Sequence, residues 1–391
     1  MEKLNLERLN TLIFDLDGVI TSEKKYWNTA KLTVWELICS ENYLGISQYF
    51  GNSPDVSTRL VDVGDRVIPN SFIYQLKSRA INSNWDLTFF VICLHLVAIL
   101  GEFKRVKGNS WNNILDSNHL SIADKLKQLG RHLQDIEYSA PRSGSLRNRI
   151  SNSVIEEFWQ ETIELTGTAV LDYVNYFSNK KLGETLPSLD PKGELWRLCY
   201  ENFQAWYEGK KGYDLPDDET VLDLEKIKAT LHTLGNEGHY TLAIATGRPR
   251  NEVIEPLSVL GLLQYFDPKR IVTYDEVLEA ESSLSHSQTQ IKLGKPHPFV
   301  LYKAIYPDKS ADQLSSDRFQ LANGQQIAYI GDAGSDVVAA KKAGCMSIGV
   351  LTGFAEGKAR ENKKKMLADL GCDVILDSVV ELPQLLGVKI N

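Results

Sequence analysis

The stretch TLIFDLDG, residues 11–18, decides the fold. Its first four residues form a short apolar run, which stops at two acidic residues and a glycine. This pattern is typical of a buried strand whose carboxyl end opens onto a site. Residues two apart on an extended strand face the same side, so Asp15 and Asp17 bring two carboxylates together. Their repulsion needs an offsetting charge, and hard carboxylate oxygens suit Mg²⁺.

Further apolar runs of the same kind follow much later in the chain. They are YTLAIA (240–245), QIAYI (326–330), MSIGV (346–350) and the short run at 373–376. Helical patterns at 250–261 and 336–343 follow the first two of these runs. Alternation of strands and helices predicts right-handed βαβ units, and therefore an α/β fold with a doubly wound parallel sheet.

The residues between the first strand and the later ones show a different pattern. Apolar residues recur at spacings of three and four, which predicts helices. The helical patterns cover 23–40, 71–80, 85–103, 122–133, 153–176 and 194–208. We therefore predict an all-helical domain at 22–215, inserted into a core domain formed by 1–21 and 216–391. The polar stretches 139–149 and 276–290 read as loops, and the three arginines of the first leave open a contact with an anion.

Bulk composition narrows the class of protein. The net charge of −8 disfavours nonspecific binding to nucleic acid, which needs a basic surface. Five scattered cysteines without a CxxC pair, behind a charged N-terminus, predict reduced thiols and a cytoplasmic protein. The longest apolar run, LTFFVICLHLVAIL, is shorter than the ~17–25 residues that span a bilayer. We expect a buried helix there and no membrane association.

Polar residues at the ends of the later strands complete a candidate site. Thr246 and Gly247 offer a hydroxyl and an N–H group where a helix begins, which suits a phosphate, although a threonine there could simply cap the helix. Lys295 lies in LGKPHP, where the prolines keep it outside a helix. Asp332 ends a strand, and Asp336 falls in the first helical turn, where an acid also favours the helix dipole. The carboxyl ends of the strands converge on one crevice of such a sheet. The polar residues that follow these strands are therefore predicted to form a single site.

With these motifs the sequence resembles the haloacid dehalogenase-like hydrolase superfamily, in particular its phosphoglycolate phosphatase and β-phosphoglucomutase branch. The resemblance rests on FDLDGVITS (14–22), AIATGRP (243–249), LQYFDPKRIVTYDEV (263–277), GKPHPFVLYKAI (294–305), YIGDAGSDVVAAKKAG (329–344) and GVLTGF (349–354). It implies a Rossmann-like core with a helical cap over the site. The insertion is longer than the cap usual in that branch, so the resemblance does not fix the substrate.

The resemblance also implies roles for individual residues. Asp15 would be the nucleophile, and Asp17 the general acid and base. Phosphate would be bound by Gly18, Thr246, Gly247 and Lys295. Mg²⁺ would be held by Asp15, Asp332 and the main-chain carbonyl of Asp17, with Asp336 beside them. We therefore expect a Mg²⁺-dependent phosphatase that acts on a small phosphorylated metabolite through an aspartyl-phosphate; a phosphomutase using the same nucleophile is the alternative.

Overall fold

The computed structural model divides the chain into two compact units. Unit 1 comprises Met1–Glu23 and Asp218–Asn391, and unit 2 comprises Lys24–Asp217. The structure describes residues 6–50, 64, 66–79, 81, 83–108, 111–115, 119–139, 153–184, 186, 189–191, 193–215, 219–284, 291–316, 318–353 and 357–388. The arginine-containing stretch at 140–149 lies outside these residues.

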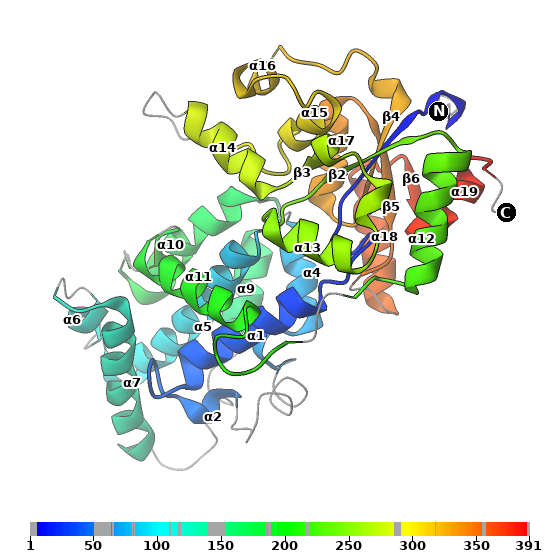
Figure 1. The fold of residues 1–391 in the computed structure, drawn as a ribbon. Coiled ribbons are helices and arrows are strands. Elements are labelled where there is room, and N and C mark those ends of the chain that lie inside the picture. Colours follow the sequence, from blue (N-terminus) through cyan, green and yellow to red (C-terminus); the bar gives the residue numbers. More distant parts are fainter. Residues whose placement is uncertain are drawn as a thin grey trace. The chain divides into compact units, whose positions relative to one another are not determined.

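A six-stranded parallel sheet organises unit 1 (Figure 1). Its strands are β1 (Thr11–Phe14), β2 (Thr241–Ala245), β3 (Ile271–Val272), β4 (Ile327–Gly331), β5 (Met346–Val350) and β6 (Val374–Leu376). The strand order is β3-β2-β1-β4-β5-β6, and every neighbouring pair is parallel. The predicted doubly wound α/β sheet is therefore confirmed. The chain reverses its direction of winding between β1 and β4, which is where such sheets place their ligands.

Alternation along β1 explains why the sheet is covered on both faces. Leu12 and Phe14 pack into one apolar core, whereas Ile13 between them packs into another. Side chains two apart share a face of a strand, so the TLIF run supplies both layers. Helices α12 (Leu224–His232) and α13 (Asn251–Val259) pack into the first core, and α15 (Phe299–Ile305) and α17 (Gly334–Ala343) into the second.

The remaining helices of unit 1 lie between the later strands of the sequence or after the last one. They are α14 (Tyr274–Leu284), α16 (Ala311–Ser315), α18 (Lys358–Asp369) and α19 (Leu382–Leu385), with a π-helical turn at Thr233–Glu237 and short 3₁₀ turns at Leu6–Arg8, Leu263–Tyr265, Pro268–Arg270, Gly324–Gln326 and Val379–Glu381. The reading of 276–290 as a loop was wrong for its first part. Val277 and Ala280 are buried on α14, so this acidic stretch has an apolar face that its polar composition concealed.

Unit 2 contains only helices among its described elements. They are α1 (Lys24–Cys39), α2 (Ser47–Phe50), α4 (Asn70–Ser78), α5 (Asn84–Lys107), α6 (Asn112–Leu115), α7 (Ile122–Ser139), α9 (Ser153–Glu161), α10 (Thr168–Leu182) and α11 (Glu194–Tyr207). The single pattern expected at 153–176 is two helices, because the chain turns at Gly167, whose φ is 58°. Glycine adopts this left-handed backbone at little cost.

Helix α5 is long and apolar enough to cross a membrane by length and composition alone. Within unit 2, 83% of its most apolar window is buried. It packs against α1, α10 and α11, and a helix that is apolar on all sides belongs in the centre of a bundle. The expectation of a buried helix at this position is confirmed.

Candidate active site

The turn after β1 positions the two aspartates of the DLDG motif. Asp15 is only 6% exposed, and its N–H donates to the carbonyl of Ile330 on β4 at 2.9 Å. Its Oδ1 accepts a hydrogen bond from the N–H of Leu16 at 2.9 Å. Gly18 then reverses the chain with a φ of 72°, a conformation that glycine tolerates best. The strand therefore delivers the Asp15 carboxylate to the switch point of the sheet.

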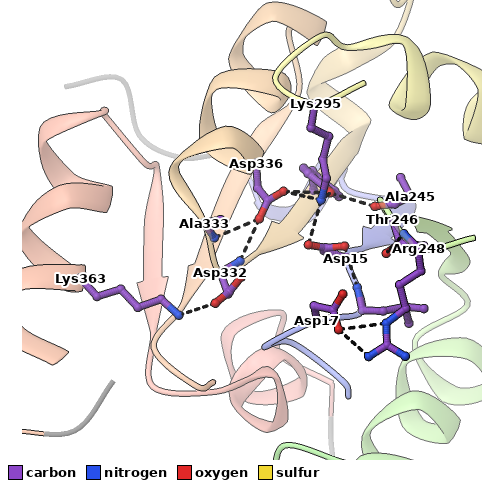
Figure 2. A network of polar contacts seen from close by, with 12 residues as sticks. Asp15, Asp17, Ala245, Thr246, Arg248, Lys295, Asp332, Ala333, Asp336 and Lys363 are labelled. Atoms are coloured by element: carbon purple, nitrogen blue, oxygen red, sulfur yellow. Dashed lines mark hydrogen bonds and ion pairs between the residues drawn. The ribbon is translucent and has the colours of Figure 1, made fainter. Parts of the chain in front are cut away.

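Lys295 connects this carboxylate with the fourth strand (Figure 2). Its Nζ lies 2.8 Å from Oδ2 of Asp15 and 2.8 Å from Oδ1 of Asp336. It also donates to the hydroxyl of Tyr329 at 3.1 Å, and that hydroxyl donates to the carbonyl of Ala245 at 2.9 Å. One buried ammonium group thus links the residue after β1 with residues of β4 and α17, and through Tyr329 it is connected to β2.

Three carboxylates gather around this point. One oxygen each of Asp15, Asp332 and Asp336 lies within 4.8 Å of the others, and all three residues are buried. Oδ2 of Asp336 accepts from the N–H groups of Asp332 at 3.1 Å and Ala333 at 3.0 Å, so it holds the turn between β4 and α17. Oδ2 of Asp332 pairs with Nζ of Lys363 at 2.8 Å. Three of the four predicted acidic residues therefore meet, whereas the carboxylate of Asp17 pairs with Arg248.

Burial and neighbouring charges shift the proton affinities in this cluster. Burial raises the pKa of Asp15 to about 7; Lys295 opposes this rise, while Asp336 and Asp17 add to it. Burial lowers the pKa of Lys295, but the negative charges of Asp15 and Asp336 together outweigh burial and hold that pKa well above its usual value. The lysine is therefore a permanent cation, and the Asp15 carboxylate is stabilised by it.

The cluster fits a divalent cation. Among the described residues, three buried carboxylates here are paired with two ammonium groups, those of Lys295 and Lys363, which leaves an excess of negative charge. Oxygen-only donors of this kind suit Mg²⁺. The backbone also approaches closely, since a Cβ on Gly18 would come within 2.5 Å of Oδ2 of Asp332.

The end of β2 presents the predicted phosphate donors. Thr246 is buried, and its N–H donates to the carbonyl of Val272 on β3 at 3.0 Å. Gly247 is exposed, and a Cβ placed there would meet nothing within 4 Å, so a ligand can approach its amide. Gly18 differs, because its N–H donates to the carbonyl of Thr21 at 2.8 Å and a phosphate would have to compete for it. The role of Gly18 in phosphate binding stays a prediction.

Two charged residues of the site were not predicted. Arg248 is 2% exposed and donates from Nε to Oδ1 of Asp17 at 2.9 Å. Lys363 is 6% exposed and reaches Asp332 from α18. Arg248 directly follows the Thr246–Gly247 pair, which was a usable signal. Lys363 lies in the run NKKK, which is typical of a solvated helix face and gave no signal.

A family model described as haloacid dehalogenase-like hydrolase matches residues 148–350. The matched stretch exceeds half of the chain and includes four of the predicted site residues, Thr246, Lys295, Asp332 and Asp336. It begins after Asp15 and Asp17, so these two aspartates are assigned from the motif at β1 and from the geometry around it.

Curated relatives and a solved structure are similar to this chain. The phosphoglycolate phosphatase of Pectobacterium atrosepticum is 27% identical over 199 residues, which cover 51% of this chain and 67% of that protein. The phosphoglycolate phosphatase of Escherichia coli K12 is 28% identical over 198 residues, which cover 51% of this chain and 62% of that protein. The X-ray structure of a Northeast Structural Genomics Consortium target superposes with a TM-score of 0.66 at 24% identity, covering 97% of this chain and 98% of that one. This last likeness is one of fold.

Proposed function

Because this chain belongs to the haloacid dehalogenase-like hydrolase family, we propose that it is a Mg²⁺-dependent phosphatase acting on a small phosphorylated metabolite. The observation that carries the proposal is the contact between Lys295 and the buried Asp15, next to the carboxylates of Asp332 and Asp336. A carboxylate held in this way is a suitable nucleophile for phosphoryl transfer, which depends more on positioning and charge than on covalent assistance.

In the first half-reaction, a carboxylate oxygen of Asp15 forms a bond to phosphorus. The bond between phosphorus and the ester oxygen breaks, and Asp17 gives its proton to the departing alkoxide. In the second half-reaction, Asp17 takes a proton from water as that water attacks phosphorus. The Asp15–phosphorus bond then breaks, and inorganic phosphate leaves. Proton transfer by a positioned group contributes about 10²–10⁴-fold to such reactions.

Phosphate oxygens would be bound by residues that follow the carboxyl end of β2 and by Lys295, which precedes α15. Thr246 offers its hydroxyl and Gly247 its amide, both at the strand next to Asp15. Lys295, already 2.8 Å from Asp15, would contact a phosphoryl oxygen as a point charge. Gly18 would contribute to phosphate binding because its backbone can lie close to the phosphate.

Asp15, Asp332 and the main-chain carbonyl of Asp17 would hold Mg²⁺, with Asp336 beside them. When bound, the cation would offset the charge repulsion between carboxylate and phosphate. Lys295 favours the ionised form of Asp15 against the opposing effect of burial, and Asp336 holds the turn that carries Asp332.

The proposal is tested with a panel of phosphorylated metabolites, measuring free phosphate with Mg²⁺ and after chelation. We expect Mg²⁺-dependent release from at least one monoester and none from Asp15→Asn, whose circular dichroism should match the wild type. Metal-independent turnover, or turnover by Asp15→Asn, would contradict the proposal. Transfer to a second hydroxyl with a bisphosphate requirement, in place of phosphate release, would indicate a phosphomutase.

A further inference from the structure

The side chain of Arg248 is buried between two segments of unit 1. Its Nε donates to Oδ1 of Asp17 at 2.9 Å, and its Nη2 donates to the same oxygen at 2.5 Å. Nη2 also contacts Oγ1 of Thr21 at 3.1 Å and the carbonyl of Ser22 at 3.4 Å, while Nη1 contacts the carbonyl of Glu252 at 3.3 Å. A planar guanidinium with this many partners has one orientation.

The contact with Asp17 is selective between the two carboxylate oxygens. Both arginine donors lie on Oδ1, and the Asp17 side chain is 20% exposed, in contrast to 1% for Arg248. Figure 2 shows the guanidinium on one side of the Asp17 carboxylate, with Asp15 nearby. A short acid in a turn has several rotamers, and a charge-assisted fork removes that freedom.

We propose that Arg248 is the positioning residue for Asp17: by holding Oδ1 it directs Oδ2 to the leaving-group oxygen and later to water. The inference rests on the proposed phosphatase function. In both half-reactions the proton would move at Oδ2, because Arg248 occupies Oδ1. Arg248 itself exchanges no proton and touches no reacting atom.

A purely structural role for Arg248 has a different consequence. The residue also ties the turn at Thr21 and Ser22 to the start of α13, so its loss could loosen the whole site. Loosening would slow every substrate alike. Loss of an oriented acid slows a substrate in proportion to how much its leaving group needs a proton.

The experiment compares two substrates in single-turnover and burst kinetics with Mg²⁺. p-Nitrophenyl phosphate releases a stable anion and needs little acid help, whereas an alkyl phosphate releases a strongly basic alkoxide. We compare wild type with Arg248→Met and Arg248→Lys. Arg250→Met is the matched control, because Arg250 pairs with Glu276 and the carbonyl of Ile271, away from Asp17.

For Arg248→Met we expect the first chemical step with the alkyl phosphate to slow about 100-fold, within the range of general acid catalysis. The first step with p-nitrophenyl phosphate should change less than about 10-fold, and a burst of nitrophenol should appear because hydrolysis of the intermediate still needs Asp17 as base. The rates of Arg248→Lys should fall between those of wild type and Arg248→Met, since lysine keeps the positive charge but cannot donate two parallel hydrogen bonds. Arg250→Met should behave as wild type.

Equal slowing of the first step for both substrates would overturn the inference, and so would unchanged rates for both. Asp15→Asn is measured in the same assay. If that variant turns over, the proposed function fails; if it is inactive while Arg248→Met slows both substrates alike, only the inference about Arg248 fails. Should Arg248→Met not fold, Arg248→Lys carries the same comparison.

Discussion

Lys363 differs from the lysines that follow it on α18. It is 6% exposed and pairs with Oδ2 of Asp332, whereas Lys364 and Lys365 are exposed. Its Nζ also donates to the carbonyl of Thr352 at 2.7 Å, after the end of β5. A buried carboxylate that loses its counter-ion is strongly destabilising. Lys363 therefore stabilises the site when no metal is bound.

Replacement of Lys363 should make the protein more dependent on metal. We expect Lys363→Met to lower the free energy of unfolding of the metal-free protein by about 3 kcal/mol, because Asp332 loses its partner. Mg²⁺ should then raise the melting temperature of the variant more than that of wild type, since the cation replaces the missing charge. Thermal melts with and without Mg²⁺ measure this. The control Lys364→Met should match wild type. The prediction would be contradicted if Mg²⁺ raised the melting temperature of Lys363→Met by the same amount as that of wild type.

At the scale of residues, the sequence predicts those parts of the site that follow a strand directly. Asp15, Asp332 and Asp336 meet because the ends of adjacent parallel strands share one edge. The two basic partners were harder to predict: the position of Arg248 beside Thr246 and Gly247 gave a signal that was not used, whereas nothing local distinguishes the buried Lys363 from a solvated lysine. Their role depends on contacts with residues 231 and 31 positions away along the chain.

At the scale of elements, apolar runs that end at acids or glycine predicted five strands. The two-residue strand β3 was not predicted, since its pairing with β2 is tertiary and its length gives no periodicity. Helix boundaries were less certain where polar residues dominate, as in α14. The hydrophobic pattern shows which face of a helix is buried, but it does not show at which residue the helix begins or ends.

A buried histidine on α5 makes the stability of unit 2 depend on pH. Nε2 of His95 donates to the carbonyl of Val67 at 3.2 Å, so in the neutral ring Nδ1 accepts from the Tyr49 hydroxyl at 3.2 Å. Burial lowers the pKa of His95 from 6.5 to about 4, despite the opposing hydrogen bond to Val67. A base with a lowered pKa stabilises the folded state above pH 6.5, and this contribution is lost as pH falls from 6.5 to about 4.

We therefore expect wild type to lose about 2 kcal/mol more unfolding free energy than His95→Gln between pH 7 and pH 4.5. Glutamine keeps a donor and an acceptor but does not titrate. Urea unfolding followed by tryptophan fluorescence measures this, because all seven tryptophans lie in unit 2. The same pH dependence in both proteins would show that His95 is not the group responsible.

At the scale of the whole molecule, the insertion leaves and re-enters unit 1 at adjacent points. The N–H of Ser22 donates to the carbonyl of Glu219 at 2.6 Å, and the N–H of Val221 donates to the carbonyl of Ile20 at 2.9 Å. All six strands of the sheet belong to unit 1. A short glycine-rich linker in place of Lys24–Asp217 would therefore preserve the sheet and the acidic cluster.

We expect this shortened protein to fold and melt cooperatively by circular dichroism, because the core of unit 1 is formed by its own residues. It should hydrolyse p-nitrophenyl phosphate but lose the preference of the full chain among phosphorylated metabolites, since we propose that unit 2 selects the substrate. The full-length protein, assayed on the same panel, is the control. An unchanged order of preference would show that selection resides in unit 1.

In the proposed reaction, the phosphoryl group is bonded covalently to Asp15 before it is released. The direct measurement is to quench the enzyme during turnover, reduce it with borohydride, and identify the modified residue by peptide mass spectrometry. An acyl phosphate at Asp15 predicts conversion of that residue alone to homoserine, in a substrate-dependent manner and not in Asp15→Asn. Turnover without modification of Asp15, or modification at another residue, would contradict the account.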